Sequence, residues 1–265
     1  MNREQFFERL WQDFVVMAPQ AAALRDRLSA TGEPVENDHV AFRTLARPAL
    51  GIEALERRLL GFGYRILTDY AFPEKKLRAR AYVLEGAPRI FLSELLVDEL
   101  SPAARRILEG IAAEARGRVP EGPEVFWAGR LWAPIPFAEY ELLAAESEYG
   151  AWLAALGLRP NHFTVSINAL RRLRTVEAVL EFVEQAGYRI NTSGGRVKGS
   201  PAQLLEQGST LADRMEVEFA GGERQVIPTC YYEFALRHRD ARGRLYEGFV
   251  PASADKIFES TDRTR

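Results

Sequence analysis

The tetrapeptide Gly-Tyr-Arg-Ile occurs twice in this sequence of 265 residues, at positions 63–66 and 187–190. Each copy follows an Asx-His pair, an apolar stretch, a polar connection and a segment with apolar residues at helical spacing. The separation of His39 from Tyr64 is 25 residues, and that of His162 from Tyr188 is 26. This agreement in order and spacing predicts an internal duplication of a module that contains a strand and a helix.

The first module, residues 35–97, is predicted to contain a strand at 39–44, a helix near 51–62, and strands at 64–70, 78–84 and 89–94. The second module, residues 159–250, repeats this order. It is predicted to contain a strand at 162–168, a helix at 175–186, and strands near 188–191, 214–219 and 226–237. Residues 192–213 are interpreted as an insertion between its helix and its later strands.

Helical segments surround the two modules. Residues 3–30 have helical periodicity that stops at Thr31-Gly32. Residues 98–158 form a predicted helical insertion between the modules. Its first helix begins with Ser101 as N-cap and Pro102 at the first helical position, and its last helical segment ends at Gly157.

The composition excludes several classes of protein. A net charge of -2 and a pI near 6.1 provide no basic surface for nucleic acid. The local cluster Arg171, Arg172 and Arg174 lies between a predicted strand and helix, so we interpret it as a solvated turn. No apolar run reaches the roughly 18 residues of a membrane span. The single cysteine, Cys230, cannot form an internal disulfide, which favours a reducing, cytoplasmic location.

Three strand-like stretches carry the chemistry, and the first is His-Val-Ala-Phe-Arg. Alternate side chains of a strand share a face, so His39, Ala41 and Arg43 lie on one side. Val40 and Phe42 lie on the other side, which is the core side. The first side therefore carries an imidazole that can bind a metal and a guanidinium.

The second stretch is His-Phe-Thr-Val-Ser-Ile-Asn. One face is apolar and the other is small and polar, with His162, Thr164, Ser166 and Asn168. A face of this kind lies against bulk water or lines a wet, enclosed cavity. The match of His162 to His39 in the duplicated module favours the cavity.

The third stretch is Cys-Tyr-Tyr-Glu-Phe-Ala-Leu-Arg-His. Tyr231, Glu233, Ala235 and Arg237 share one face. Burial of Glu233 in so apolar a strand requires a cation nearby, either an arginine or a bound metal ion. Because two matched histidines need a third ligand, we favour the metal ion. His238, at the end of the strand, is predicted to lie at the surface.

Two imidazoles and one carboxylate form the facial triad of non-haem Fe(II) enzymes, which leaves coordination positions open. Those positions suit a bidentate 2-oxo acid and dioxygen. A structural zinc site would be closed by four ligands, preferably cysteines, and this chain has one cysteine. Glu94, near the end of the last strand of the first module, is interpreted as the counterpart of Glu233 and as a reserve ligand.

The pattern resembles the vicinal oxygen chelate fold of extradiol dioxygenases and glyoxalases. More narrowly, five motifs are similar to the 2-oxoadipate dioxygenase/decarboxylase family, also described as D-2-hydroxyglutarate synthase. They are DHVAFRT, NHFTVSIN, GGRVKGSP, CYYEFALR and ADKIFEST, and they extend from residue 38 to 261. The resemblance implies an α/β (α+β) fold in which two tandem βαβββ modules form one curved mixed sheet, with N-terminal and inter-module helices.

The resemblance also implies an activity. Fe(II) would be held by His39, His162 and Glu233, and Arg43 would bind the substrate carboxylate. A planar, bidentate donor suits that carboxylate. The implied reaction is oxidative decarboxylation and hydroxylation of 2-oxoadipate by dioxygen. Its products are 2-hydroxyglutarate and carbon dioxide, in lysine catabolism.

The remaining substrate contacts are less defined by the sequence. The candidates are Arg43, Thr164, Ser166, Lys198 and Tyr231, and the candidates for a distal carboxylate are Lys198, Arg80 and Arg237. The resemblance implies that the characterised enzymes of this kind are longer than this compact chain, and that their extra segment helps to bind the distal carboxylate. Two other functions stay open: an oxygen-independent isomerase or lyase of the glyoxalase type with Glu233 or Glu94 as base, and a non-catalytic protein that binds a small molecule.

Overall fold

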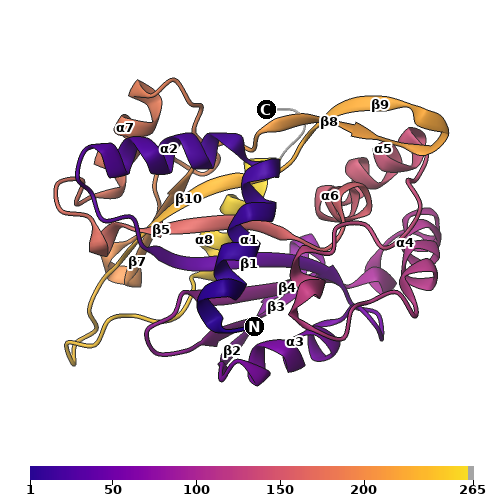
Figure 1. The fold of residues 1–265 in the computed structure, drawn as a ribbon, viewed down its shortest axis with the longest axis horizontal. Coiled ribbons are helices and arrows are strands. Elements are labelled where there is room, and N and C mark those ends of the chain that lie inside the picture. Colours follow the sequence, from indigo (N-terminus) through magenta and orange to yellow (C-terminus); the bar gives the residue numbers. More distant parts are fainter. Residues whose placement is uncertain (262–265) are drawn as a thin grey trace.

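Eight strands form one curled mixed sheet in the computed structural model, which describes residues 1–261 (Figure 1). The strand order across the sheet is β2-β3-β4-β1-β5-β10-β7-β6. The first module supplies β1 (Asn37–Leu45), β2 (Arg65–Phe72), β3 (Leu77–Val83) and β4 (Arg89–Leu95). The second module supplies β5 (Pro160–Ser166), β6 (Lys198–Ser200), β7 (Leu205–Ser209) and β10 (Tyr231–Arg237).

The strands pair in the same pattern in the two halves of the sheet. β1 pairs with β4 in parallel, and β5 pairs with β10 in parallel. The antiparallel contact between β1 and β5 joins the two halves at the centre of the sheet. The predicted fold class, two βαβββ modules in one curved mixed sheet, is therefore confirmed.

The connections within each module also correspond. Each first strand is followed by one helix, α3 (Ile52–Gly61) in the first module and α7 (Val176–Gln185) in the second. A short 3-10 turn that begins with proline then joins β2 to β3 and β6 to β7. Each turn ends on a residue in the left-handed region, Lys76 at φ 54° and Leu204 at φ 63°. The same local backbone thus closes both hairpins.

The strand assignment for the second module was wrong in its middle part. β6 and β7 lie inside residues 192–213, which were interpreted as an insertion, and residues 188–191 form no strand beyond a bridge between Ile190 and Thr210. The actual insertion is a separate hairpin of β8 (Arg214–Glu218) and β9 (Arg224–Pro228). In this hairpin, exposed and partly buried residues alternate as they do in a strand of a larger sheet, which explains the wrong assignment. The true strands β6 and β7 are short and rich in Gly and Ser, so they have no clear alternation.

Two N-terminal helices cover the convex face of the sheet (Figure 1). They are α1 (Arg3–Met17) and α2 (Pro19–Ala30). Pro19 cannot continue a helix, so the predicted helix over 3–30 is divided at Ala18. The rings of Phe14 and Phe163 lie 5.0 Å apart, which shows that the apolar face of β5 packs under α1 as alternation predicted.

Three helices between the modules stand at one end of the sheet. They are α4 (Pro102–Ala115), α5 (Phe137–Glu146) and α6 (Glu148–Leu156). The predicted start of α4 is confirmed, because the Ser101 hydroxyl accepts a hydrogen bond from the amide of Ala104. The buried helix α6 brings Tyr149 and Trp152 against the end of β1.

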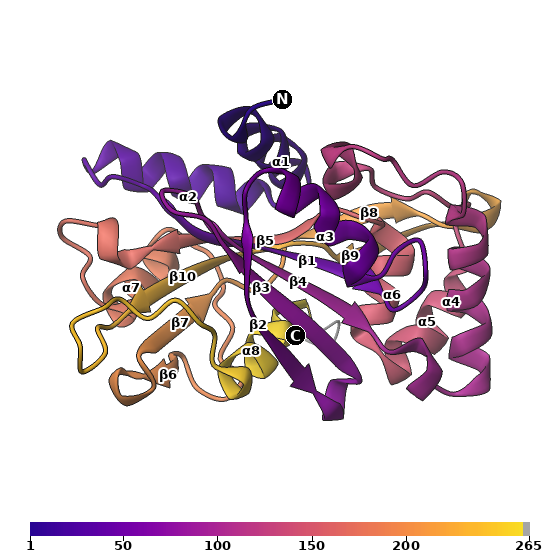
Figure 2. The ribbon, with the colours of Figure 1, turned by 90° about the horizontal axis from the view of Figure 1, so that it is seen from below.

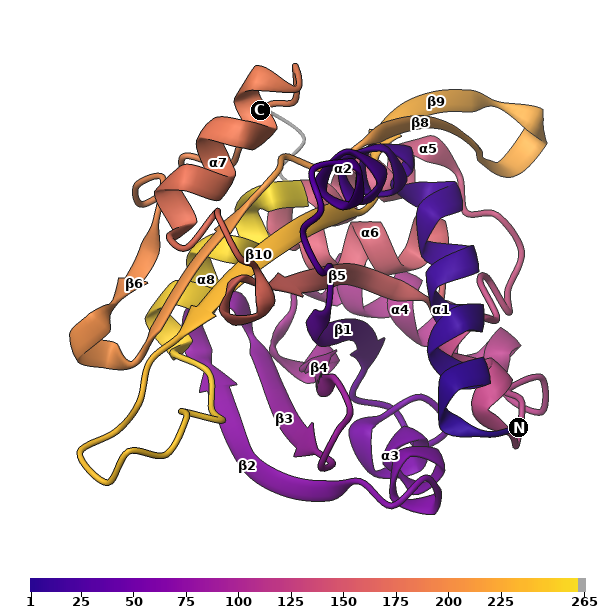
Figure 3. The same cartoon turned by 60° about the vertical axis from the view of Figure 1, so that its left-hand side comes forward.

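The last helix, α8 (Pro251–Phe258), lies on the concave side of the sheet. It contacts β2 from the first module and β6 and β7 from the second (Figures 2 and 3). The C-terminal segment therefore closes the hollow that the curled sheet forms. Among residues 1–261, none of the helices has the length and apolar character needed to cross a membrane.

Candidate metal centre

Three adjacent central strands bring His39, His162 and Glu233 together on the concave face. His39 comes from β1, His162 from β5 and Glu233 from β10. Their ligand atoms all lie within 4.8 Å of one another, and all three side chains are buried. The Glu233 carboxylate has one oxygen 3.5 Å from His39 Nε2 and the other 3.2 Å from His162 Nε2. The residues that alternation selected therefore converge on one point.

The register of the strands explains this convergence. Thr164 of β5 is paired with His39 on one side and with Glu233 on the other. Its hydroxyl lies 3.1 Å from His39 Nε2. Since side chains at paired positions share a face, the β1 and β10 ligands lie on either side of β5.

The residue before each histidine orients its ring. Asp38 Oδ1 lies 2.7 Å from His39 Nδ1, and Asn161 Oδ1 lies 3.1 Å from His162 Nδ1. Each oxygen accepts a hydrogen bond from the Nδ1–H group, which leaves each Nε2 lone pair directed at the shared point. The Asx-His pairs in the sequence are thus explained by the orientation of the two ligands.

Burial controls the charge of the metal-free site. It lowers the pKa of His39, although the hydrogen bond that His39 donates to Asp38 acts in the opposite direction. It also lowers the pKa of His162 well below the ordinary value. Burial raises the pKa of Glu233 to about 8, which a hydrogen bond of 2.6 Å from Gln207 Nε2 partly offsets. Both imidazoles are therefore neutral near pH 7, and the carboxyl retains a proton until a cation arrives.

The donor set fits a divalent cation with open coordination positions. Glu233 Oε2 is buried and accepts no hydrogen bond from any described residue. Two imidazole nitrogens and one carboxylate on one side match the facial triad. Among residues 1–261 no other group of histidine, cysteine, aspartate or glutamate side chains meets at a possible metal site. The arrangement is thus that of a catalytic metal site rather than a closed, four-ligand structural one.

Arg43 lies on the same face of β1, four residues beyond His39. Its side chain is 2% exposed, and one nitrogen donates a hydrogen bond of 3.0 Å to Thr261 Oγ1. Within residues 1–261, its Nε and Nη1 have no hydrogen-bond partner. Its guanidinium carbon lies 5.0 Å from the ring centres of both Tyr149 and Trp152. A buried cation with two unused donors is suited to bind an anion.

We call the place on which the ligand atoms of His39, His162 and Glu233 converge the metal point. Two further predicted contacts border it. The ring of Tyr231 stacks on that of His162, with centroids 4.6 Å apart. The Tyr231 hydroxyl is buried and has no hydrogen-bond partner in the described part of the chain. Thr164 lies between two of the ligands, as described above. The Thr164 hydroxyl and the Tyr231 ring therefore each contact one of the two histidines.

Ser166 and Lys198 lie farther along the same strands. Ser166 occupies the position in β5 that Arg43 occupies in β1, four residues after the histidine, and is half-buried. Lys198, at the start of β6, is buried and donates through Nζ to the carbonyl of Asn191. Neither belongs to the group of three metal-ligand candidates, although the positive charge of Lys198 acts to lower the pKa of Glu233.

Two candidates for a distal carboxylate are already paired. Arg80 binds Asp69 and Glu56, and Arg237 binds Asp38 and two backbone carbonyls. Neither is free to bind a second carboxylate. His238 is partly exposed and lies 2.7 Å from Glu206, which confirms its position away from the centre.

Glu94 is not the counterpart of Glu233. In the first module His39 pairs with Arg89, and in the second His162 pairs with Tyr231. Counting along β4 and β10 from these pairs places Phe91 at the position of Glu233. The buried Glu94 carboxylate instead accepts a hydrogen bond of 2.7 Å from the amide of Ile52 and pairs with Arg78. Its interpretation as a reserve ligand is therefore wrong.

The C-terminal segment covers the metal point. A small cavity of about 20 Å³ remains there, lined by His39, Phe91, His162, Gln207, Glu233, Phe249, Ala254, Ile257 and Phe258. A larger cavity of about 280 Å³ lies on the other side of Phe258 and reaches Arg43. Gln207 was missed in the sequence because it lies in β7, within the supposed insertion.

The fold and the site together define a metal-dependent enzyme of the vicinal oxygen chelate type. Two βαβββ modules form one half-barrel, and a two-histidine, one-carboxylate triad lies on its inner face. A protein from Ralstonia eutropha JMP134 that is grouped with the glyoxalase superfamily has the same fold. The two structures align with a TM-score of 0.74 and 25% identity over 92% of this chain and 84% of that one.

The family model described as 2-oxoadipate dioxygenase/decarboxylase matches residues 12–121 and 124–244. This chain belongs to that family. A rice protein named 2-oxoadipate dioxygenase/decarboxylase, chloroplastic/amyloplastic, is 36% identical over 88% of this chain and 71% of its own length.

Two solved structures are also similar. The hydroxyglutarate synthase from Oryza sativa, solved in complex with 2-oxoadipate, aligns with a TM-score of 0.91 and 32% identity, covering 98% of this chain and 92% of that one. A protein from Shewanella frigidimarina NCIMB 400 aligns with a TM-score of 0.88 and 42% identity, covering 94% of this chain and 98% of that one.

Proposed function

We propose that this protein is an Fe(II)-dependent dioxygenase that converts 2-oxoadipate and dioxygen into 2-hydroxyglutarate and carbon dioxide. The observation that carries the proposal is the convergence of His39, His162 and Glu233 on one buried point of the family's fold. The rice structure with 2-oxoadipate bound supports the choice of substrate.

In this proposal His39, His162 and Glu233 hold the iron. Bound Fe(II) supplies coordination positions for the 2-oxo acid and for dioxygen, and it transfers electrons between them. The neutral state of both imidazoles favours binding of the ion, and Asp38 and Asn161 keep the two rings in the ligand orientation. Glu233 releases its proton as the cation binds and then contributes a negative charge.

Arg43 binds a carboxylate of the substrate. Its two unused donor nitrogens, Nε and Nη1, provide charge-assisted hydrogen bonds, and the rings of Tyr149 and Trp152 lie against the guanidinium. Thr164 and Tyr231 offer hydroxyls next to the metal point, and we include Ser166 and Lys198 as contacts farther from it. The apolar side chains of the C-terminal segment exclude bulk water, which strengthens these polar contacts.

The reaction balances without an external reductant. One carbon leaves as carbon dioxide. One oxygen atom of dioxygen enters the new carboxylate at the former keto carbon, and the other enters as a hydroxyl on the adjacent carbon of the shortened chain. The substrate supplies all four electrons that reduce dioxygen, two in oxidative decarboxylation and two in hydroxylation. The protein therefore needs no redox partner chain for this step.

We also propose a cellular setting. Conversion of 2-oxoadipate to 2-hydroxyglutarate belongs to lysine catabolism. The single cysteine, Cys230, is buried and free, which is consistent with a reducing, cytoplasmic location.

Oxygen uptake by protein reconstituted anaerobically with Fe(II) tests this function. With 2-oxoadipate we expect equal amounts of oxygen consumed, carbon dioxide released and 2-hydroxyglutarate formed. Absence of uptake with every member of a panel of 2-oxo acids would contradict the dioxygenase. Turnover that persists without oxygen would favour the glyoxalase-type alternative. Ligand binding that His39→Ala leaves intact would favour the non-catalytic one.

A further inference from the structure

Arg237, the last residue of β10, is a fully buried arginine that lies between the metal centre and the C-terminal segment. Its side chain is 0% exposed. We call residues 246–258, which include α8, the C-terminal strap. The guanidinium contacts both Asp38 and the start of this strap.

One side of the guanidinium holds Asp38. Nε donates to Asp38 Oδ2 at 2.7 Å, and Nη2 donates to Asp38 Oδ1 at 2.9 Å. The same Oδ1 lies 2.7 Å from His39 Nδ1. The pair is therefore bidentate, and it fixes the carboxylate that orients a metal-ligand candidate.

The other side of the guanidinium holds the strap. Nη1 donates to the carbonyl of Gly248 at 2.7 Å and to the carbonyl of Tyr246 at 3.1 Å. The guanidinium carbon also lies 5.2 Å from the ring centre of Phe249. The Arg237 side chain thus binds the first residues of the strap through two backbone carbonyls and the ring of Phe249.

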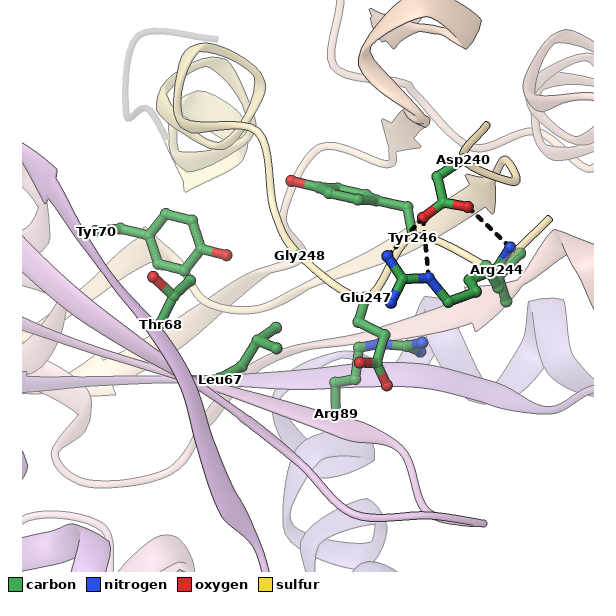
Figure 4. Close-up of a pocket in the computed structure, with 10 residues that line it drawn as sticks. Leu67, Thr68, Tyr70, Arg89, Asp240, Arg244, Tyr246, Glu247 and Gly248 are labelled. Atoms are coloured by element: carbon green, nitrogen blue, oxygen red, sulfur yellow. Dashed lines mark hydrogen bonds and ion pairs between the residues drawn. The ribbon is translucent and has the colours of Figure 1, made fainter. Parts of the chain in front are cut away.

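The strap separates two spaces. On its inner side, Phe249 packs edge-on against the His39 ring at 4.8 Å and helps to line the cavity of about 20 Å³. On its outer side, Tyr246 and Gly248 line an open pocket of about 730 Å³ (Figure 4). Figure 4 shows the strap at Gly248 passing between Tyr70 of β2 and Tyr246.

The inner cavity is too small for a substrate. A volume of about 20 Å³ holds about one water molecule, far less than a chelating 2-oxo acid. The strap must therefore withdraw, at least in part, before such a molecule reaches the metal point. When it withdraws, Arg237 loses the acceptors that hold it against Asp38 from the far side.

The duplication does not repeat this arrangement. In the second module the residue that orients the ligand is the neutral Asn161, and its Nδ2 has no hydrogen-bond partner among residues 1–261. By the same strand register, the counterpart of Arg237 in β4 is Leu95. Asp38 of the first module and Arg237 of the second thus form a charged pair, whereas the corresponding pair, Asn161 and Leu95, carries no charge.

We propose that Arg237 is a positioning residue that couples docking of the C-terminal strap to the orientation of His39. The inference rests on the proposed metal site and adds to it a link between closure and the ligand. Coupling between two events is reciprocal, so binding of a metal ion should tighten the strap as much as the docked strap favours the metal.

Amide hydrogen exchange of the strap, measured on the full chain with and without Co(II), tests this link. Co(II) also reports on the site through its visible absorption. In the wild type we expect Co(II) to slow exchange across residues 246–258 by about fivefold or more. The matched control is Arg89→Lys, because Arg89 also lies near Asp38, at 3.6 Å, and no hydrogen bond joins it to the strap. In Arg89→Lys, Co(II) should bind and should slow exchange of the strap as it does in the wild type.

Arg237→Lys should break the link while it keeps the charge beside Asp38, because one ammonium cannot reproduce a planar bridge. We expect Co(II) to bind with roughly tenfold lower affinity and no longer to slow exchange of the strap. If Co(II) slows exchange of the strap in this variant as much as in the wild type, the proposal is overturned. If Arg237→Lys does not fold, Asp38→Asn serves instead. Slowing of strap exchange by Co(II) to the wild-type extent in Asp38→Asn would equally overturn the proposal.

The same data distinguish this proposal from the proposed function. A wild type that binds Co(II), with no change in exchange of the strap, overturns the coupling and leaves the metal site intact. A wild type that does not bind Co(II) overturns both.

Discussion

The rings of His39 and His162 lie 5.5 Å apart and almost perpendicular, at 86°, although the residues are 123 positions apart in the sequence. They come from equivalent positions of two duplicated modules that meet antiparallel at β1 and β5. The two modules thus each supply one histidine of the candidate metal site, and the second module alone supplies the carboxylate, Glu233. In the first module the equivalent position is Phe91, which lines the cavity.

Removal of one imidazole should abolish metal binding. In His162→Ala we expect the bound metal to fall from about one ion per chain to near zero after dialysis. The apparent affinity should fall by more than the roughly hundredfold typical for residues that only orient a ligand. Metal analysis by mass spectrometry measures this. His238→Ala is the matched control, since His238 pairs with Glu206 away from the centre, and a loss of metal there would count against the assignment.

Metal affinity should depend on pH through Glu233. In the metal-free protein burial raises the pKa of this carboxyl to about 8. Below that pH, binding must release a proton, so affinity should rise about tenfold per pH unit and level off above pH 8. Burial lowers the pKa of both histidines, so they add no slope near neutral pH. Titration with Mn(II) between pH 6 and 9 measures the slope, and a flat profile would contradict the account.

Arg43→Met should impair the reaction and spare the metal. Loss of a charge-assisted hydrogen bond of about 1.5–3 kcal/mol should lower kcat/KM by roughly tenfold to hundredfold. Because the variant removes a buried cation with two unused donors, the metal-free protein should melt no lower than the wild type. The control is Arg224→Met, on the exposed hairpin. Unchanged kcat/KM in Arg43→Met would exclude Arg43 from substrate binding.

Glu94→Ala should destabilise the fold without loss of metal. It leaves the buried amide of Ile52 without its acceptor and removes one of the two carboxylates that pair with Arg78, at a cost of about 1–3 kcal/mol in the free energy of unfolding. Urea denaturation of the metal-free protein measures the cost. Metal content near one per chain should persist, and its loss in a folded variant would restore Glu94 as a ligand.

The triad was predictable because its strands are central and buried on both faces. In β1, β5 and β10 the alternation of side chains alone separates the ligand face from the core face, whatever the partner strands are. The repeated Asx-His pair then indicated which positions correspond. Helix boundaries such as Ser101-Pro102 were predictable for a local reason as well, since capping depends on a few neighbouring residues.

Long-range features could not be predicted in this way. The counterpart of Glu233 depends on the register between β1 and β4, which no local pattern reports, and Glu94 was chosen wrongly for that reason. The partner of Asp38 is Arg237, 199 residues away. The strap that closes the site ends in an eight-residue helix whose docking place the sequence does not indicate.

Anomalous diffraction at the iron absorption edge, from crystals soaked anaerobically with Fe(II), tests the central claim most directly. The account predicts one peak within about 2.0–2.3 Å of the Nε2 atoms of His39 and His162 and of a Glu233 carboxylate oxygen. A peak elsewhere, or no peak between these three side chains, would contradict it.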